Sequence, residues 1–246
     1  KTKTKFIVLA TAAALLPIAV ATVALATSES QKLARPEGPC DIYDASGAPC
    51  VAAHSTTRAL YASYNGPLYQ VVRASDGKTL DIGVVQPSEN DGGGYADAEA
   101  QDDFCANTTC WISIIYDQSG KENHLVQAPH GGFKGPAMGG FNNIPIADMA
   151  PVTLMGHKVY GAYFIPGMGL RWNDAKGTAV DDQSEGQYWV INGHHYNTGC
   201  CFDYGNAETD SRDDGDGTME KLANRLNQKN NMVKRGITPC RGDVKA

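Results

Sequence analysis

The chain has 246 residues, a net charge of −6 and 42% hydrophobic residues. It contains no basic stripe, no Gly-rich phosphate loop and no heptad repeat, which excludes electrostatic nucleic-acid binding, P-loop nucleotide binding and a coiled coil. No cofactor is expected.

The N-terminal stretch has the order of a secretory signal peptide. Three lysines among the first five residues precede an apolar run over residues 6–26, which ends in the small-residue sequence Ala24-Leu25-Ala26. A membrane-spanning helix is the competing interpretation, because about 20 apolar residues can cross a bilayer. Pro17 interrupts the run and favours the signal. We therefore predict a signal peptide over residues 1–26 and a secreted, extracellular protein without membrane attachment after cleavage.

The seven cysteines suit an oxidising compartment, where they most simply form disulfides with one left over. Cys40 and Cys50 are close in sequence, as are Cys105 and Cys110, and both spacings suit small local loops. Asn107 begins an Asn-Thr-Thr sequon, which predicts N-glycosylation on a surface loop. The close cysteine pairs have no matching partners at zinc-finger distances, so no metal site is expected.

The composition changes near residue 218. Residues 27–218 contain 11 basic and 25 acidic residues, whereas residues 219–246 contain seven basic and two acidic residues and no aromatic one. The first segment is typical of an extracellular β protein that binds neutral polar ligands. We predict one domain over residues 27–218 and a divergent basic tail over residues 219–246 outside the fold, with a short surface helix at most near residues 220–226.

Short apolar runs separated by turn residues predict an all-β sandwich. The gap from 128 to 145 is too long for a plain connection and is predicted to be a rim or binding loop. The expected helices cover residues 55–63 and 96–104. The expected strands cover residues 68–74, 79–85, 111–117, 152–154, 158–165 and 187–191.

Cys200 and Cys201 are adjacent in the sequence. Neighbouring Cα atoms are about 3.8 Å apart, while ordinary disulfides have roughly 4.4–6.8 Å, so a bond between the two would close a strained ring. Such strain collects at functional sites, and the ring would offer a rigid platform for the apolar face of a sugar. The alternative is that each cysteine pairs elsewhere or stays a buried thiol. Trp111, Trp172 and Trp189 are either stacking platforms or packing residues.

Four strings resemble the fungal α-L-arabinofuranosidase B family, glycoside hydrolase family 54. They are GPCDIY at 38–43, CVAAHSTTRALY at 50–61, IYDQSG at 115–120 and CCFDYGNAE at 200–208. The resemblance runs from about Gly38 to about Glu220. It implies a secreted, monomeric enzyme that removes terminal α-L-arabinofuranosyl groups from arabinose-containing plant cell-wall polysaccharides with retention of configuration.

The resemblance also implies a fold and a disulfide pattern. The family's catalytic domain is a two-sheet, jelly-roll-like (concanavalin-like) β-sandwich, of which this chain is expected to form an incomplete version with few short helices. The implied disulfides are Cys40–Cys50, Cys105–Cys110 and the vicinal Cys200–Cys201, which would line the sugar pocket.

The chain departs from the family after Glu220. Retaining hydrolysis requires two carboxyl groups about 5–5.5 Å apart, and neither the family's nucleophilic Glu motif nor its acid/base Asp motif is found in this sequence. We expect a truncated gene model or retained intron rather than a shortened paralogue, and Cys240 in the tail has no family partner. Asp203, Glu208 and Glu220 are not expected to replace the catalytic pair, although Asp203 is a candidate for contacts with sugar hydroxyls.

Three functions follow from these observations. The first is an α-L-arabinofuranosidase by descent, truncated before its catalytic carboxylates and poorly soluble because of unpaired strand edges. The second is a non-catalytic, arabinose-binding lectin-like protein or an inert fragment. The third, a cell-wall structural protein, predicts repeats or low complexity, and the sequence has neither.

Overall fold

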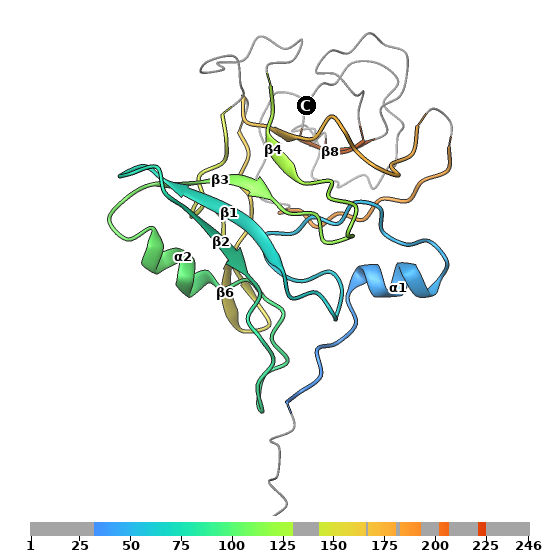
Figure 1. The fold of residues 1–246 in the computed structure, drawn as a ribbon, viewed down its shortest axis with the longest axis horizontal. Helices are drawn as coiled ribbons and strands as arrows, with labels where there is room; N and C mark the ends of the chain where they lie inside the picture. Colours follow the sequence, from blue (N-terminus) through green and yellow to red (C-terminus); the bar gives the residue numbers. More distant parts are fainter. Residues whose placement is uncertain are drawn as a thin grey trace, which may run out of the picture. The chain divides into compact units, whose positions relative to one another are not determined.

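The computed structural model describes residues 32–129, 143–165, 167–180, 183–192, 202–206 and 221–224. These residues form mostly antiparallel strands, with two short helices, α1 (Pro39–Ala45) and α2 (Ala98–Phe104) (Figure 1). The strands are β1 (Pro67–Arg73), β2 (Thr79–Gly83), β3 (Cys110–Ile115), β4 (Leu125–Gln127), β5 (Pro151–Leu154), β6 (His157–Tyr160), β7 (Leu170–Arg171), β8 (Phe202–Gly205) and β9 (Lys221–Asn224). A five-stranded sheet has the order β2-β1-β3-β4-β7, and β5-β6 and β8-β9 form two-stranded sheets.

The centre of the large sheet is the β1–β2 hairpin with β3 along the other side of β1. Gln70 pairs with Asp81 and Val71 with Leu80 across the hairpin. The turn between the strands includes Gly77, whose φ of 70° is a left-handed conformation that glycine adopts without a Cβ clash. The chain therefore reverses where the sequence carries its Ser-Asp-Gly turn signal.

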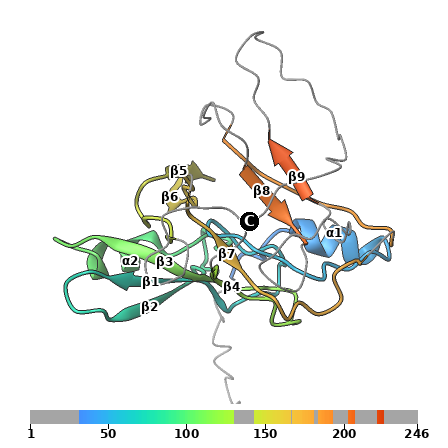
Figure 2. The same cartoon turned by 90° about the horizontal axis from the view of Figure 1, so that it is seen from above.

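One face of the sheet holds the main core. Tyr69, Val71, Ile82 and Ile112 alternate with more exposed residues along their strands and have 0% exposure. Each fully buried side chain of this size contributes about 1.5–3 kcal/mol. Val159 of β6 belongs to the same cluster, and Figure 2 shows the β5–β6 hairpin on one side of the sheet.

Helix α2 is fixed against this face by a buried glutamine. The Tyr69 hydroxyl donates to Gln101 Oε1 at 2.6 Å, and Gln101 Nε2 donates to the Ala147 carbonyl at 3.1 Å. The N-terminus of α2 is capped by Asp97, whose side chain accepts from the Ala100 N–H at 3.0 Å. The side-chain amide of Gln101 therefore joins the helix, the sheet and the loop at Ala147, and both its oxygen and its nitrogen are paired.

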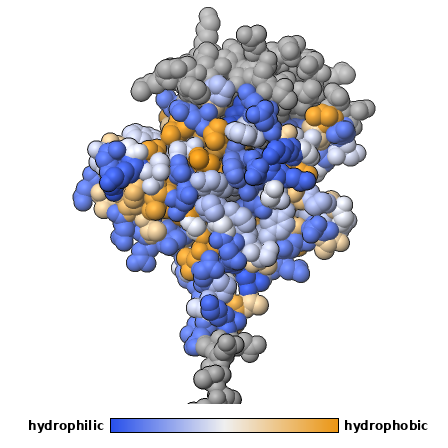
Figure 3. All heavy atoms as spheres, in the orientation of Figure 1, coloured by the Kyte–Doolittle hydropathy of each residue, from blue (hydrophilic) through white to orange (hydrophobic). Residues whose placement is uncertain are grey.

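The opposite face of the sheet carries a group of polar side chains at its centre. Gln70, Asp81 and Tyr116 are linked by hydrogen bonds, with the Tyr116 hydroxyl donating to Asp81 at 2.8 Å and Gln70 Nε2 at 2.9 Å from the same carboxylate. The view in Figure 3 shows mainly hydrophilic residues with small separate groups of hydrophobic ones.

The expectation of a mostly β structure with few short helices is confirmed, and the jelly-roll-like sandwich stays a prediction.

The predicted helix at 55–63 is wrong. The backbone N–H of Ala59 donates to the Gly94 carbonyl at 2.7 Å, and that of Leu60 donates to Gln118 Oε1 at 2.7 Å. These donors would otherwise make the i to i−4 bonds of a helix. The helix that the sequence analysis missed is α1, which begins with a proline at its first turn.

The structure confirms the expected helix at 96–104, shortened to α2, and five of the expected strands with shifted ends. The predicted strand at 187–191 is wrong, because those residues carry no strand assignment. The helix suggested for residues 220–226 is also wrong, since residues 221–224 form β9 and pair with β8. A tertiary partner outweighs local helix propensity in so short a segment. The described residues contain no helix with the length and apolarity needed to cross a bilayer.

Candidate functional site

Asp117 lies at the end of β3 and joins the chain before and after it. Its carboxylate accepts from the Ala53 N–H at 2.8 Å, the Ser119 N–H at 2.9 Å, the Ser119 hydroxyl at 2.7 Å and the Asn123 N–H at 3.0 Å. The residue is only 5% exposed. All four donors point at one buried charge, so Asp117 holds the 51–54 segment against the 117–124 loop.

These contacts also set the charge of Asp117. Burial disfavours the ionised form, but the hydrogen bonds from Ser119, Ala53 and Asn123 outweigh it, so the pKa of Asp117 is lowered. A carboxylate with its acceptor positions filled and a lowered pKa is a poor general acid. Asp117 is therefore a structural anion.

Asn123 connects three segments that are far apart in sequence. Its side-chain Nδ2 donates to the carbonyls of Val51 at 2.8 Å and Lys176 at 3.0 Å, and its Oδ1 accepts from the Lys176 N–H at 2.7 Å. Asn123 is 3% exposed and its side-chain polar atoms are paired. The loop at 173–180 is thus tied to the region that contains the disulfide of Cys50.

His54 adds β8 to this arrangement. Its Nε2 is 2.6 Å from the Asn123 carbonyl oxygen, and its Nδ1 is 2.9 Å from the Tyr204 hydroxyl. The two rings meet edge to face, with centroids 5.9 Å apart. We call His54, Asp117, Asn123 and Tyr204 the His54 cluster. It is where segments near residues 54, 120 and 204 converge.

The ionisation of the His54 cluster follows from its burial. Burial lowers the pKa of His54, against smaller opposing effects of the Asn123 hydrogen bond and the Asp117 charge. Burial also raises the pKa of Tyr204, with a further contribution from Asp117. At neutral pH the cluster therefore contains a neutral imidazole, a protonated phenol and one carboxylate.

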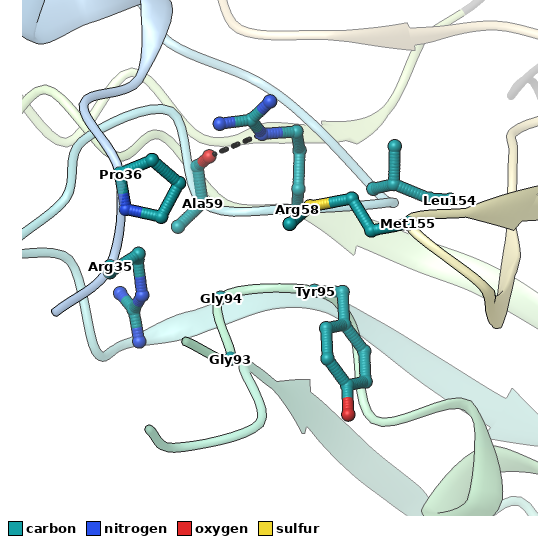
Figure 4. Close-up of a pocket in the computed structure, with 9 residues that line it drawn as sticks. All are labelled: Arg35, Pro36, Arg58, Ala59, Gly93, Gly94, Tyr95, Leu154 and Met155. Carbon is teal, nitrogen blue, oxygen red and sulfur yellow. Dashed lines mark hydrogen bonds between the residues drawn. The ribbon is translucent and has the colours of Figure 1, made fainter. Parts of the chain in front are cut away.

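A small pocket lies elsewhere, between the 93–95 loop and the tip of the β5–β6 hairpin (Figure 4). Arg58 Nε donates to the Ala59 carbonyl at 3.0 Å, and Arg35 NH1 donates to the Ala62 carbonyl at 3.2 Å. No carboxylate is among the residues that line it. These are Arg35, Pro36, Arg58, Ala59, Gly93, Gly94, Tyr95, Leu154 and Met155. The pocket lacks the groups that cleavage of a glycosidic bond requires.

For five carboxyl groups in the described ranges the surroundings shift the pKa, and each shift is downward, whereas a general acid needs a raised pKa. Hydrogen bonds from cations, hydroxyls and backbone N–H groups lower these pKa values, and they outweigh the effect of burial where burial opposes them. The carboxyl groups with a lowered pKa are Asp76, Asp91, Asp102, Asp117 and Glu122. The same part of the chain contains no cluster of three or more His, Cys, Asp or Glu residues suited to a metal.

Several predicted site residues lie outside the described residues. These are the doublet Cys200 and Cys201, the carboxylates Glu208 and Glu220, the leftover Cys240, and the signal peptide over residues 1–26. Asp203 is described in its backbone, which pairs with Ala223. The doublet stands directly before β8 in the sequence, and β8 carries Tyr204 of the His54 cluster.

The two local disulfides are confirmed. Cys40 and Cys50 have a Cα–Cα distance of 5.6 Å, and Cys105 and Cys110 one of 5.8 Å, both within the ordinary range. Asn107 lies in the loop that the second disulfide closes. The residue is exposed, and its backbone φ is 61°. The surface position of the sequon is confirmed, and its glycosylation stays a prediction.

The three tryptophans differ in exposure. Trp111 in β3 and Trp189 are partly buried, and Trp172 is 37% exposed. Trp172 directly follows β7 and is the most accessible for stacking.

The role of the His54 cluster was not predicted from the sequence. His54 lies inside the string at 50–61, and Asp117 lies inside the string at 115–120. The signal that was available is that both strings carry the family resemblance. The contact between them requires the fold, because His54 and Tyr204 are 150 residues apart.

A sequence profile of the family described as "Alpha-L-arabinofuranosidase B, catalytic" matches residues 39–238, which extends beyond Glu220 into the basic stretch. Alpha-L-arabinofuranosidase B of Emericella nidulans is 62% identical over 185 residues, covering 75% of this chain and 35% of the relative. Alpha-L-arabinofuranosidase of Hypocrea jecorina is 60% identical over 185 residues, with 75% and 36% covered. The chain spans about a third of the length of the curated relatives it matches.

Solved structures give the same result. A crystal structure of arabinofuranosidase complexed with arabinofuranosyl-alpha-1,2-xylobiose matches with a TM-score of 0.71 and 59% identity, covering 76% of this chain and 38% of that chain. A GH54 α-L-arabinofuranosidase soaked with a cyclic sulfate inhibitor matches with the same values.

Proposed function

The chain belongs to the alpha-L-arabinofuranosidase B catalytic family, and from this premise we propose that it is part of a secreted, retaining α-L-arabinofuranosidase. Its substrates would be terminal L-arabinofuranosyl groups of arabinan and arabinoxylan. The observation that carries the proposal is the family match over residues 39–238. Support for the substrate class comes from the relative that was crystallised with an arabinofuranosyl-xylobiose.

Within this proposal, the described residues supply the scaffold and not the catalytic pair. Each carboxyl group whose pKa is shifted there has a lowered pKa and a structural partner. A retaining glycosidase needs a nucleophile and a general acid close together. The proposed sugar contact is the doublet Cys200–Cys201 in its disulfide form, directly before β8. Residues 1–26 as a signal, a monomeric state and the jelly-roll-like sandwich belong to the same proposal.

The activity test uses the whole chain, expressed in a secreting host, with a chromogenic arabinofuranoside. The matched positive control is the Emericella nidulans relative. We expect secretion with cleavage near residue 26 and no turnover above background by this chain. Turnover that disappears on changing Asp203, Glu208 or Glu220 would contradict the assignment of the catalytic pair to other residues.

The binding test separates a non-catalytic arabinose-binding protein from an inert fragment. Calorimetric titration with L-arabinose should give heat with the oxidised chain and none with a Cys200→Ser, Cys201→Ser double variant. A Cys240→Ser variant is the matched control and should bind as the unchanged chain does. Heat that is lost in the double variant supports sugar binding at the doublet. No heat in any form removes both the lectin-like candidate and the proposed sugar contact.

A further inference from the structure

The contacts of His54 define its protonation. The Asn123 carbonyl can only accept a hydrogen bond, so His54 Nε2, at 2.6 Å, must carry a proton. A neutral ring then has an unprotonated Nδ1, which accepts from the Tyr204 hydroxyl at 2.9 Å. The imidazole therefore donates one hydrogen bond to the Asn123 backbone and accepts another from Tyr204 of β8.

Other contacts of β8 and of the residue after it involve partners outside the His54 cluster. β8 pairs with β9, and Asn206, which follows it, donates from Nδ2 to the Ala179 carbonyl at 2.6 Å. Tyr204 of β8 contacts His54, which in turn contacts Asn123 of the loop held by Asp117. The hydrogen bond and the edge-to-face ring contact with His54 occur at this one point.

We propose that His54 is a positioning residue that fixes β8 by accepting the Tyr204 hydroxyl, and that sugar affinity depends on this hydrogen bond. The part about affinity rests on the proposed function, because it takes β8 to belong to the arabinose-binding region. The part about β8 does not. His54 itself contacts no reacting atom in this scheme.

The proposal includes a dependence on pH. The titratable groups that face His54 are Asp117, His124 and Tyr204. Protonation would place a hydrogen on Nδ1 and turn it from acceptor to donor, so the Tyr204 hydroxyl would lose the acceptor for its own proton. Asp117 would partly compensate the new charge, and His124 would oppose it. The hydrogen bond between His54 and Tyr204 that fixes β8 should therefore weaken below neutral pH.

Two substitutions at position 54 distinguish the hydrogen bond from simple packing. In His54→Asn, the side-chain oxygen can replace Nδ1 as an acceptor for Tyr204 but does not titrate. In His54→Gln, the longer side chain can still donate to the Asn123 carbonyl but no longer offers the acceptor at the Nδ1 position. His157→Gln is the control, because His157 of β6 is a half-buried histidine that stacks on Tyr95 and does not belong to the His54 cluster.

The experiment measures hydrogen exchange of a peptide that contains β8, corrected for intrinsic rates, and L-arabinose affinity by calorimetry, each at pH 7.5 and 5. For His54→Gln we expect about tenfold faster exchange and about tenfold weaker affinity, as for loss of one hydrogen bond. His54→Asn should resemble the unchanged chain at pH 7.5 and lack its acid-side loss. His157→Gln should behave as the unchanged chain.

Unchanged exchange in His54→Gln would overturn the proposal, as would an acid-side loss in His54→Asn equal to that of the unchanged chain. Absence of arabinose heat from the unchanged chain would contradict the proposed function, and the exchange result alone would then decide the role of His54. Binding that is insensitive to His54→Gln would refute the link between β8 and affinity.

Discussion

The five-stranded sheet and the residues after β7 are held in place by different forces. Tyr69, Ile82 and Ile112 of the sheet are completely buried, whereas Val190 is 77% exposed and Tyr188 47% exposed. The described segments at 172–180 and 202–206 form hydrogen bonds with Asn123 and His54, and Asn206 joins the two segments to each other. Apolar burial spreads over many contacts, while hydrogen bonds are directional and few. Single polar substitutions should therefore loosen the later segments and leave the sheet intact.

The largest effect is expected where the sheet itself is broken. Ile112→Ala should lower the free energy of unfolding by about 2–5 kcal/mol, because it removes apolar contacts and leaves a cavity. Both regions should unfold together in urea. The control, Ile42→Ala at a side chain 60% exposed, should change little. Loss of the later segments alone in Ile112→Ala would contradict the comparison.

Asp117→Ala should give the next largest effect. It leaves the N–H groups of Ala53, Ser119 and Asn123 without their acceptor, which we expect to cost about 3 kcal/mol. Hydrogen exchange should increase at residues 51–54 and 173–180 before it increases in β1 or β3. Asp81→Ala, on the polar face of the sheet, is the comparison variant and should cost less. Uniform acceleration across the sheet would show that Asp117 acts on the core.

A smaller effect is expected from pH. Because burial lowers the pKa of His54 below its ordinary 6.5, the unfolded chain binds this proton more tightly than the folded chain. The contribution of His54 is therefore complete above about pH 6.5 and falls as pH decreases toward its own pKa, by at most about 1.4 kcal/mol per pH unit. Urea unfolding at pH 7.5 and 5.5 should show a smaller decrease in His54→Asn. An equal decrease in both would assign the loss to other groups.

The smallest effect is expected at Lys176. Its Nζ is 2.9 Å from Glu122 Oε2, but the two side chains are 59% and 73% exposed, so water and salt screen the pair. The contacts with Asn123 use the backbone of Lys176 and survive Lys176→Ala. We expect no measurable change in urea unfolding. A clear destabilisation would mean that the exposed pair, and not Asn123, holds the 173–180 segment.

The parts of the fold that were predicted correctly are those with local signals. β1 and β2 alternate apolar and polar residues around a Ser-Asp-Gly turn, and α2 begins after the Asp97 cap. The expected helix at 55–63 failed because its backbone donors bond to Gly94 and Gln118, which are distant in sequence. The strands β4 and β7 have three and two residues, too few for a periodicity to be detected.

The candidate site was predictable only in part. The pairs Cys40–Cys50 and Cys105–Cys110 follow from short spacing, because a local loop brings such residues within bonding distance. The doublet Cys200–Cys201 was found from adjacency alone and lies outside the described residues. His54 carried no chemical signal in sequence, since a single histidine between apolar and polar residues fits many roles.

The sequence by itself determined the two local disulfides, the central hairpin and the family, because each depends on short strings of neighbouring residues. It also predicts the secretory signal in the same way. Only the tertiary structure decided that Asp117 is a saturated structural anion, that Asn123 joins three segments, and that His54 accepts the hydroxyl of Tyr204. Besides the nearby donors Ser119 and Asn123 of Asp117, these roles depend on partners 53 to 150 residues away. No local pattern specifies such pairings, because they form only when the packed core brings the loops together.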